Sequence, residues 1–343
     1  MRVSYLCLEQ SAVGSAADAH LKGFFEQWPE GSLVVTRASH RADDALRVKI
    51  VSIGLALWRF VQTFQHADVV GARAHPLVAL GILPGRLTGK RIFLFLQGRP
   101  DDLPGASPFY RVLGWISAVS IARALRWADV VFATSEGLLG WARSQSQGAV
   151  IQVTNGVDVG RFPWPVEGKR GVVFVGTPAP WQGLSTLLEA VASPNWPDDL
   201  PLTVIGVSRP KAHLMIDARV TFLGRLPPNE VAEVLSRSAI GVSPKRLDRA
   251  TRMGVSPFKM AEYHGAGLAV LASDVPGQRE MINASKGGAL FKPDSASEIA
   301  SIVQLWHAHP KRLETMQGNA RRFAEEELTW EAQRFRIRRA LLE

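Results

Sequence analysis

The chain has little cysteine: only one of its 343 residues is a cysteine, Cys7. A single thiol excludes an internal disulfide and a cysteine-based metal site. The first residues also lack a basic segment followed by an apolar one, so no secretory signal is expected. These absences predict a protein of the reducing cytoplasm.

Long apolar runs are absent as well. The two most apolar stretches, Ile50–Trp58 and Val112–Ala122, lie between basic residues. Both are too short to cross a membrane, because a spanning helix needs about 20 apolar residues. We expect them first as buried helices of an α/β domain, and second as segments that contact a membrane surface.

Acidic residues are fewer than basic ones, 31 against 40, which gives a formal net charge of +9. This balance favours anionic partners such as acidic lipid or a phosphorylated small molecule, although plain solubility explains it equally well. No motif of nucleic-acid recognition accompanies the charge, so nucleic acid is not expected as a partner. The acidic pairs are contiguous and the histidines lack ligand spacing, so we predict no metal.

Short apolar segments alternate with longer helical patterns along the whole chain. This alternation predicts parallel βαβ units and an α/β fold. Proline and glycine interrupt the pattern between Arg161 and Gly171, which indicates a domain boundary. We predict one Rossmann-like domain over residues 1–163, a second over 164–327, and a closing helix over 328–343. Strands are expected at 2–8, 33–36, 68–72, 91–96, 130–133, 150–154, 172–175, 202–205, 220–223, 240–243 and 269–272.

The most informative segment is Gly254–Tyr263, in which a helix is expected to begin near Pro257. The N-terminus of a helix presents free backbone N–H groups that suit a diphosphate. Lys259 in the first turn adds a positive charge. Glu262, three residues later, lies on the same face and can accept hydrogen bonds from a ribose diol. An ordinary helix start with a solvated Lys–Glu pair is the alternative.

Further blocks occur in a fixed order around this segment. They are Asn155-Gly156-Val157-Asp158, Phe174-Val175-Gly176, Trp181-Gln182-Gly183, Phe222-Leu223-Gly224 and Val242-Ser243-Pro244. Together they resemble the retaining glycosyltransferase family 4 over nearly the whole chain. The resemblance implies the GT-B architecture, with two Rossmann-like domains facing each other across a cleft. It also implies an acceptor site in the first domain and a donor site in the second.

The resemblance assigns roles to individual positions. Lys259 would meet the diphosphate, Glu262 the ribose, and the backbone near Gly224 and Arg225 the base. A glycine loop containing Gly14 and Ser15 would lie against the donor, and Gln97 would help to position the reactants. The remaining positions of the implied donor site are Gly176, Thr177, Gln182, Gly254, Val255, Ser256 and Phe258. The implied catalytic set is Lys259, Gln97 and Gly14, with no protein nucleophile, no metal and no cofactor.

The sequence departs from the family pattern at several of these positions. Gly254 stands where an acidic residue is usual, and Gln97 where a histidine is usual. Thr177 and Gln182 replace an arginine and a lysine, which removes two positive charges from the phosphate site. A basic segment with Lys245, Arg246, Arg249 and Arg252 is predicted to compensate as a phosphate loop. The alternative is a solvated basic loop.

The resemblance therefore implies transfer of a sugar from a UDP- or GDP-sugar, with retention of configuration, to a glycan or lipid-linked acceptor in polysaccharide or cell-envelope biosynthesis. Two alternatives remain: a nucleotide-sugar epimerase or phosphorylase, and a non-catalytic GT-B module that binds nucleotide or scaffolds a complex. The charge and Trp58, Trp115 and Trp127 further predict peripheral association with an anionic membrane. The alternative is that these tryptophans are buried between helices and sheet.

Overall fold

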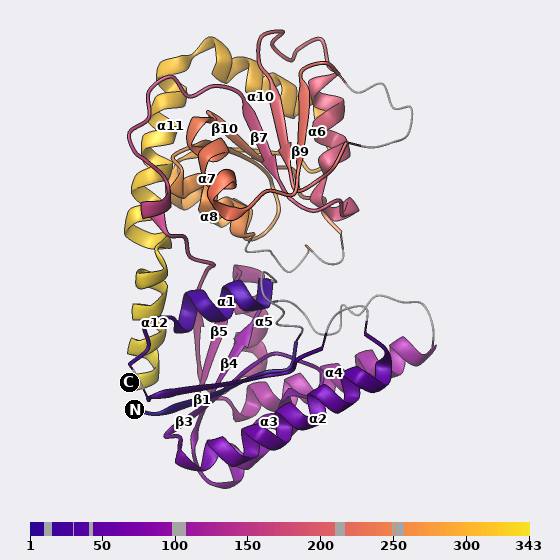
Figure 1. The fold of residues 1–343 in the computed structure, drawn as a ribbon, viewed down its shortest axis with the longest axis vertical. Helices are drawn as coiled ribbons and strands as arrows, with labels where there is room; N and C mark the ends of the chain where they lie inside the picture. The colour runs from indigo at the N-terminus through magenta and orange to yellow at the C-terminus, as the bar shows by residue number, and fades with distance from the viewer. Residues whose placement is uncertain are drawn as a thin grey trace. The chain divides into compact units, whose positions relative to one another are not determined.

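The computed structural model describes residues 1–9, 16–29, 31–40, 44–97, 108–209, 217–248, 251 and 257–343. The chain divides into two compact units, one formed by residues 1–154 and 333–343 and the other by residues 155–332. Each unit contains a six-stranded parallel sheet with helices packed on it (Figure 1). The predicted α/β fold with two Rossmann-like domains is confirmed.

The sheet of the first unit has the strand order β2-β1-β3-β4-β5-β6. Its strands are β1 (Val3–Cys7), β2 (Leu33–Arg37), β3 (Val69–Arg73), β4 (Arg91–Leu96), β5 (Val130–Ala133) and β6 (Ala149–Gln152). Strand β4 carries the apolar run Ile92–Leu96, which is buried throughout. Such a run is typical of a central parallel strand covered on both faces.

Helices cover both faces of this sheet. They are α1 (Ala16–Phe25), α2 (Leu46–Thr63), α3 (Val78–Leu87), α4 (Pro108–Trp127), α5 (Glu136–Gln145) and the closing helix α12 (Trp330–Leu342). Successive side chains of a strand point to opposite faces. The Tyr5 ring packs against Phe25 of α1, whereas Leu6 lies beside Gly81 of α3. Helix α1 therefore lies on one face and α3 on the other.

Helices α2 and α4 correct one expectation. Phe60 of α2 and Ile121 of α4 are buried, but Ile50 is 62% exposed, Trp58 58% and Trp115 68%. The expectation that the two apolar stretches form buried helices is therefore wrong for one side of each. A helix that covers a sheet buries only one stripe, and these helices are apolar beyond that stripe. In the described ranges, no helix has the length and apolar character needed to cross a membrane.

The sheet of the second unit has the order β12-β11-β10-β7-β8-β9. Its strands are β7 (Val172–Val175), β8 (Leu202–Ile205), β9 (Val220–Gly224), β10 (Ile240–Ser243), β11 (Ala269–Ser273) and β12 (Gly288–Phe291). Val172 and Phe174 pack into one buried cluster with Trp196. Val173 packs into the other with Tyr263, so the sheet separates two hydrophobic cores.

The helices of the second unit are α6 (Leu184–Val191), α7 (Pro228–Arg237), α8 (Phe258–Gly265), α9 (Gln278–Ser285), α10 (Ala296–Ala308) and α11 (Pro310–Phe323). The sequence-based assignment contained neither α9 nor β12. Strand β12 begins with glycine and alanine and has no β-branched residue, so its sequence does not mark it as a strand. Its place in the sheet comes from parallel pairing with β11, where Gly288 lies opposite Val270.

Candidate functional site

The candidate site lies where the strands of the second sheet end. Ligands of open parallel sheets bind outside the carboxyl ends of the strands. Gly176 follows β7, Lys245 lies two residues after β10, and α8 begins at Phe258 after its N-cap, Pro257. These segments supply most of the described residues of the predicted donor site.

Lys259 is the central cation of this site. Its side chain is 6% exposed, and its Nζ atom donates a hydrogen bond of 2.9 Å to Oε1 of Gln182. The same Nζ atom lies 4.1 Å from the centroid of the Phe174 ring. Burial lowers the pKa of Lys259 well below its ordinary value, the charge of Lys245 lowers it further, and Glu262 opposes both. An arriving anion would reverse this cost, because it stabilises the protonated amine.

A glycine makes room for this lysine. A Cβ atom at Gly176 would lie 2.8 Å from the Phe174 ring and 3.2 Å from Nζ of Lys259. Gly183 is a second position that only glycine suits, since its φ is +71° and a Cβ atom there would overlap the carbonyl oxygen of Pro244. The loop after β7 therefore passes close to both Lys259 and the segment after β10.

Lys245 is a second buried cation in the same site. Its side chain is 3% exposed, and its Nζ atom lies 3.7 Å from the centroid of the Trp181 ring. Burial lowers the pKa of Lys245 to about 7, against a smaller opposing effect of Asp248. The charge of Lys245 also lowers the pKa of Lys259, and two buried lysines in one site suit a multivalent anion.

Glu262 lies one turn along α8 from Lys259. Its Oε1 atom is 3.9 Å from Nη1 of Arg161, and Nη2 of Arg161 donates 2.8 Å to the carbonyl oxygen of Pro228. Burial raises the pKa of Glu262, while Arg161 and Lys259 lower it. The carboxylate keeps 24% exposure, so it can still accept hydrogen bonds from a ligand.

The predicted base-binding pair, Gly224 and Arg225, lies at the end of β9. The N–H of Gly206 donates 2.6 Å to the carbonyl oxygen of Gly224, and the N–H of Gly176 donates 3.0 Å to that of Ile205. The strand ends at 176, 206 and 224 are thus neighbours at one edge. Arg225, like Thr177, is exposed to solvent, and Phe258 is half-buried.

The predicted basic phosphate loop separates into different environments. Lys245 belongs to the buried site, whereas Nε of Arg246 forms an ion pair of 2.9 Å with Asp294. Arg249 and Arg252 lie outside the described residues. Also outside them are three predicted donor residues and the glycine loop: Gly254, Val255, Ser256, Gly14 and Ser15.

In the first unit, the predicted positioning residue Gln97 follows β4. Its Nε2 atom is buried and has no hydrogen-bond partner among the residues described. His75, after β3, has a pKa lowered to about 4 by burial and by His40.

Arg73, at the end of β3, has two polar partners. Its Nη1 atom lies 3.1 Å from Nδ1 of His20, and the Nε atom of Arg73 donates a hydrogen bond of 2.5 Å to Glu9. The ends of β3 and β4 therefore carry polar groups that can meet a hydroxylated ligand.

Sequence reasoning placed Lys259 and Glu262 but did not give Phe174, Trp181 and Arg161 a role. The structure brings these three against Lys259, Lys245 and Glu262 respectively. Phe174 and Trp181 stand in the ordered blocks, with Trp181 beside Gln182, whereas Arg161 entered only as the start of the domain boundary. An aromatic next to a phosphate-loop position is the one signal that pointed to a ring under a lysine.

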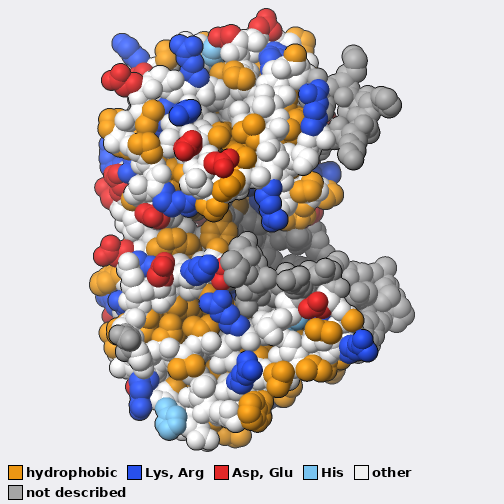
Figure 2. Space-filling model, viewed as in Figure 1, with side chains coloured by type: hydrophobic (Ala, Val, Ile, Leu, Met, Phe, Trp, Pro, Cys, Tyr) orange, Lys and Arg blue, Asp and Glu red, His pale blue; other side chains and the backbone are white. Residues whose placement is uncertain are grey.

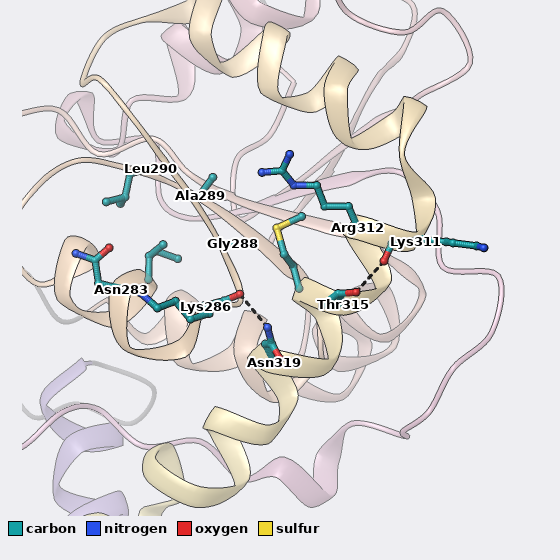
Figure 3. Close-up of a pocket in the computed structure, with 11 residues that line it drawn as sticks. Asn283, Lys286, Gly288, Ala289, Leu290, Lys311, Arg312, Thr315 and Asn319 are labelled. Atoms are coloured by element: carbon teal, nitrogen blue, oxygen red, sulfur yellow. Dashed lines mark hydrogen bonds between the residues drawn. The ribbon is translucent and has the colours of Figure 1, made fainter.

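A separate cavity of about 660 Å³ lies elsewhere in the second unit, along the free edge of β12 (Figure 3). Helices α9 and α11 border it, and its cations Lys286, Lys311 and Arg312 are exposed. No carboxylate lines it, so it lacks the acceptor that a ribose diol would use. The buried cations identify the edge near α8, not this cavity, as the candidate nucleotide site.

Three features meet near α8: the N-terminus of the helix, the two buried lysines Lys259 and Lys245, and the carboxylate of Glu262. The first two suit a diphosphate and the third suits a diol. The arrangement can therefore hold a ribonucleoside diphosphate and stabilise the negative charge that develops when a diphosphate leaves.

Residues 161–323 match the family model of the glycosyl transferases group 1, so this region is a group 1 glycosyltransferase domain. No curated protein matches the sequence significantly.

Several solved structures share the fold along the entire chain. Sucrose-phosphate synthase from Thermosynechococcus elongatus is 16% identical with a TM-score of 0.77, covering 100% of this chain and 98% of its own. HepE from Anabaena is 18% identical with a TM-score of 0.76, covering 100% of both chains. WaaG, a glycosyltransferase involved in lipopolysaccharide biosynthesis, is 14% identical with a TM-score of 0.66, covering 99% of both. These likenesses show that the chain has the GT-B fold.

Proposed function

We propose that this chain, whose residues 161–323 match the group 1 glycosyltransferase model, transfers a hexose from a UDP- or GDP-sugar with retention of configuration. The observation that carries the proposal is the pair of buried lysines beside the N-terminus of α8, with Glu262 one turn further on. These groups match the diphosphate and the ribose of such a donor.

The reaction would proceed without a protein nucleophile. The acceptor hydroxyl attacks the anomeric carbon on the face from which the nucleoside diphosphate departs. The bond to the diphosphate oxygen breaks, the glycosidic bond forms, and the departing phosphate oxygen takes the hydroxyl proton. Lys259, Lys245 and the N–H groups of α8 stabilise the charge that accumulates on the leaving group. Gln97 and Gly14 would position acceptor and donor.

Two of the similar structures support a uridine nucleotide as donor. HepE was solved with UDP, and a further structure of HepE holds UDP-glucose. We therefore propose a UDP-sugar as the first choice of donor for this chain, and a GDP-sugar as the second. The backbone at Gly224 would then lie against the base, and Glu262 against the ribose.

We further propose a glycan or lipid-linked acceptor of polysaccharide or cell-envelope biosynthesis. WaaG, which is similar over the whole chain, is involved in lipopolysaccharide biosynthesis. The acceptor would bind in the first unit, where Gln97 and His75 offer polar groups at the strand ends. A cytoplasmic location and the domain limits at residues 163 and 327 stay predictions.

The test is a transfer assay with radiolabelled UDP- and GDP-sugars and extracted glycolipid or oligosaccharide acceptors. We expect one donor to be consumed, with the product carrying the same anomeric configuration as the donor, read by NMR. Conversion of the donor to an epimer without transfer would replace the proposal with an epimerase. Binding of nucleotide without turnover of any donor would replace it with the scaffold alternative.

A further inference from the structure

Exposed apolar side chains are concentrated on three helices of the first unit. Eleven of the nineteen large apolar residues that are exposed in the described part of the chain belong to α2, α3 and α4. They are Val48, Ile50, Val51, Leu55, Trp58, Val61, Leu80, Leu87, Trp115, Ile116 and Val119. Exposed apolar residues gathered on neighbouring helices are candidates for an interaction site. We call the outer surface of α2, α3 and α4 the three-helix face.

The three helices form one continuous layer. Helix α3 contacts α2 on one side and α4 on the other, and α2 meets the sheet on the same face as α3, because Ser4 and Leu6 of β1 point to Thr63 and Gly81. A groove of about 310 Å³ runs between α3 and α4, and another of about 370 Å³ lies along α2. The groove between α3 and α4 is mainly apolar, with Arg123 at its border. The groove along α2 combines Val48, Val51 and Leu55 with Ser39, Arg47 and Ser52.

The charge on this face has one sign. Residues 46–63, 78–87 and 108–127 contain no aspartate or glutamate. They contain seven basic residues: Arg47, Lys49, Arg59, Arg86, Arg111, Arg123 and Arg126. In Figure 2, apolar and basic side chains intermix along the lower right of the molecule, where Figure 1 shows α2. Most of these arginines are exposed.

This combination decides among the possible occupants. A second copy of the chain would place one acid-free basic face against another, which like-charge repulsion disfavours. The second feature of the face is that apolar side chains stand among these basic ones. An anionic bilayer satisfies both features, since its headgroups attract the arginines and its acyl boundary accepts the aliphatic and indole side chains.

We propose that the three-helix face docks the first unit onto an anionic lipid bilayer, with α2, α3 and α4 lying in the plane of the interface. Trp58 and Trp115 enter the headgroup region, where indole rings are favoured. Docking itself does not depend on the proposed function. Its use, which is to bring the acceptor-binding unit to a lipid-linked acceptor, rests on that function.

The experiment is co-sedimentation of the full chain with vesicles of phosphatidylcholine alone or with 30% phosphatidylglycerol (about one anionic lipid in three), at low and high salt. We expect binding only to the anionic vesicles, weaker at high salt. Each basic residue near such a surface contributes about fivefold to partitioning, so Arg47→Gln, Arg59→Gln and Arg123→Gln combined should weaken binding roughly 100-fold. Trp58→Ser with Trp115→Ser should weaken it as well.

Phe335→Ser is the matched control. Phe335 is 65% exposed and lies on α12, outside the three-helix face, so its loss should leave vesicle binding unchanged. Failure of the wild-type chain to bind anionic vesicles at low salt would overturn the proposal, as would equal losses in the control. A dimer in vesicle-free solution that dissociates on Trp58→Ser and Trp115→Ser would assign the face to a second copy instead.

Failure of membrane docking can be distinguished from failure of the proposed function. Nucleotide binding by the variants, measured by calorimetry, should equal that of the wild type because the face lies in the other unit. A chain that binds vesicles but transfers no sugar would retain the docking face and lose the proposed function. A chain that transfers sugar to a water-soluble acceptor but does not bind vesicles would retain the proposed function and lose the docking face.

Discussion

Nζ of Lys259 donates a hydrogen bond of 2.9 Å to Oε1 of Gln182, a neutral residue in a position where the family pattern has a cation. A second cation this close would repel the buried amine, whereas the amide oxygen accepts from it. The second positive charge comes instead from Lys245 after β10, held against the Trp181 ring. Gln182 and Lys245 thus belong to one buried site, and compensation of the missing cation at position 182 by Lys245 stays a prediction.

Removing the amine of Lys259 should affect diphosphates selectively. A hydrogen bond to a charged group contributes about 1.5–3 kcal/mol, so Lys259→Ala should weaken nucleoside diphosphate binding by about 10- to 150-fold. Binding of the nucleoside alone should change little. Calorimetric titration with both ligands checks this, with Lys311→Ala on the exposed surface of α11 as the control. Equal losses for the two ligands would remove Lys259 from the diphosphate.

Nucleotide binding should weaken as the pH rises above 7. The pKa of Lys245 is about 7 in the free protein, and a bound diphosphate favours the protonated amine and raises that pKa. Above pH 7 the amine must take up a proton on binding, which lowers affinity by up to about tenfold per pH unit for this one group. Titrations between pH 7 and 9, in buffers of different ionisation enthalpy, measure both effects. Lys245→Met should flatten the profile, and an unchanged profile would contradict the assignment.

The same lysine gives the ligand-free protein a stability that depends on pH. Its folded pKa is about 7, below the ordinary value of 10.5, so the unfolded chain binds more protons between these two values. The free energy of unfolding should therefore rise with pH across this window, with the full cost of burying the charge present below pH 7. Urea denaturation of the wild type and of Lys245→Met at pH 6.5 and 9 compares the slopes. Parallel slopes would show that the amine is not desolvated.

Glu262 should recognise the ribose through its hydroxyls. We expect Glu262→Gln to fold normally and to bind a ribonucleoside diphosphate about 10-fold or more weakly, because hydrogen bonds to a charged acceptor contribute about 1.5–3 kcal/mol. The 2′,3′-dideoxy analogue should bind the wild type and the variant alike. If the variant fails to unfold cooperatively, the carboxylate has a structural role through Arg161 instead.

Gly176 should tolerate no side chain. In Gly176→Ala the new Cβ atom would lie 2.8 Å from the Phe174 ring and 3.2 Å from Nζ of Lys259. Overpacking of this kind costs about 1–3 kcal/mol, and displacement of the lysine should also weaken diphosphate binding. Gly140→Ala in α5, where a Cβ atom meets open space, is the control and should stabilise. Chemical denaturation that shows no difference between the two would refute the close packing.

The sequence was informative wherever the signal is local. The alternation of apolar strands and helical periods predicted two parallel sheets, because each period reflects burial of its own element. The spacing of Lys259 and Glu262 placed both on one face of a helix whose start Pro257 marks. Local signals failed at α9 and at β12, whose sequence Gly-Ala-Leu-Phe has no β-branched residue, unlike the strands of equal length that were predicted.

The environment of each site residue was decided only by the tertiary structure. Gln182 and Lys259 are 77 positions apart, and the Lys245 amine lies against a tryptophan ring from another loop. The sequence also did not predict which side of α2 is exposed, because apolar residues all around a helix do not indicate which stripe packs on the sheet. The order of residues thus determined the elements and the chemistry that they carry. Which of those groups are brought together, and which apolar surface remains uncovered, depends on contacts between distant segments that no local pattern contains.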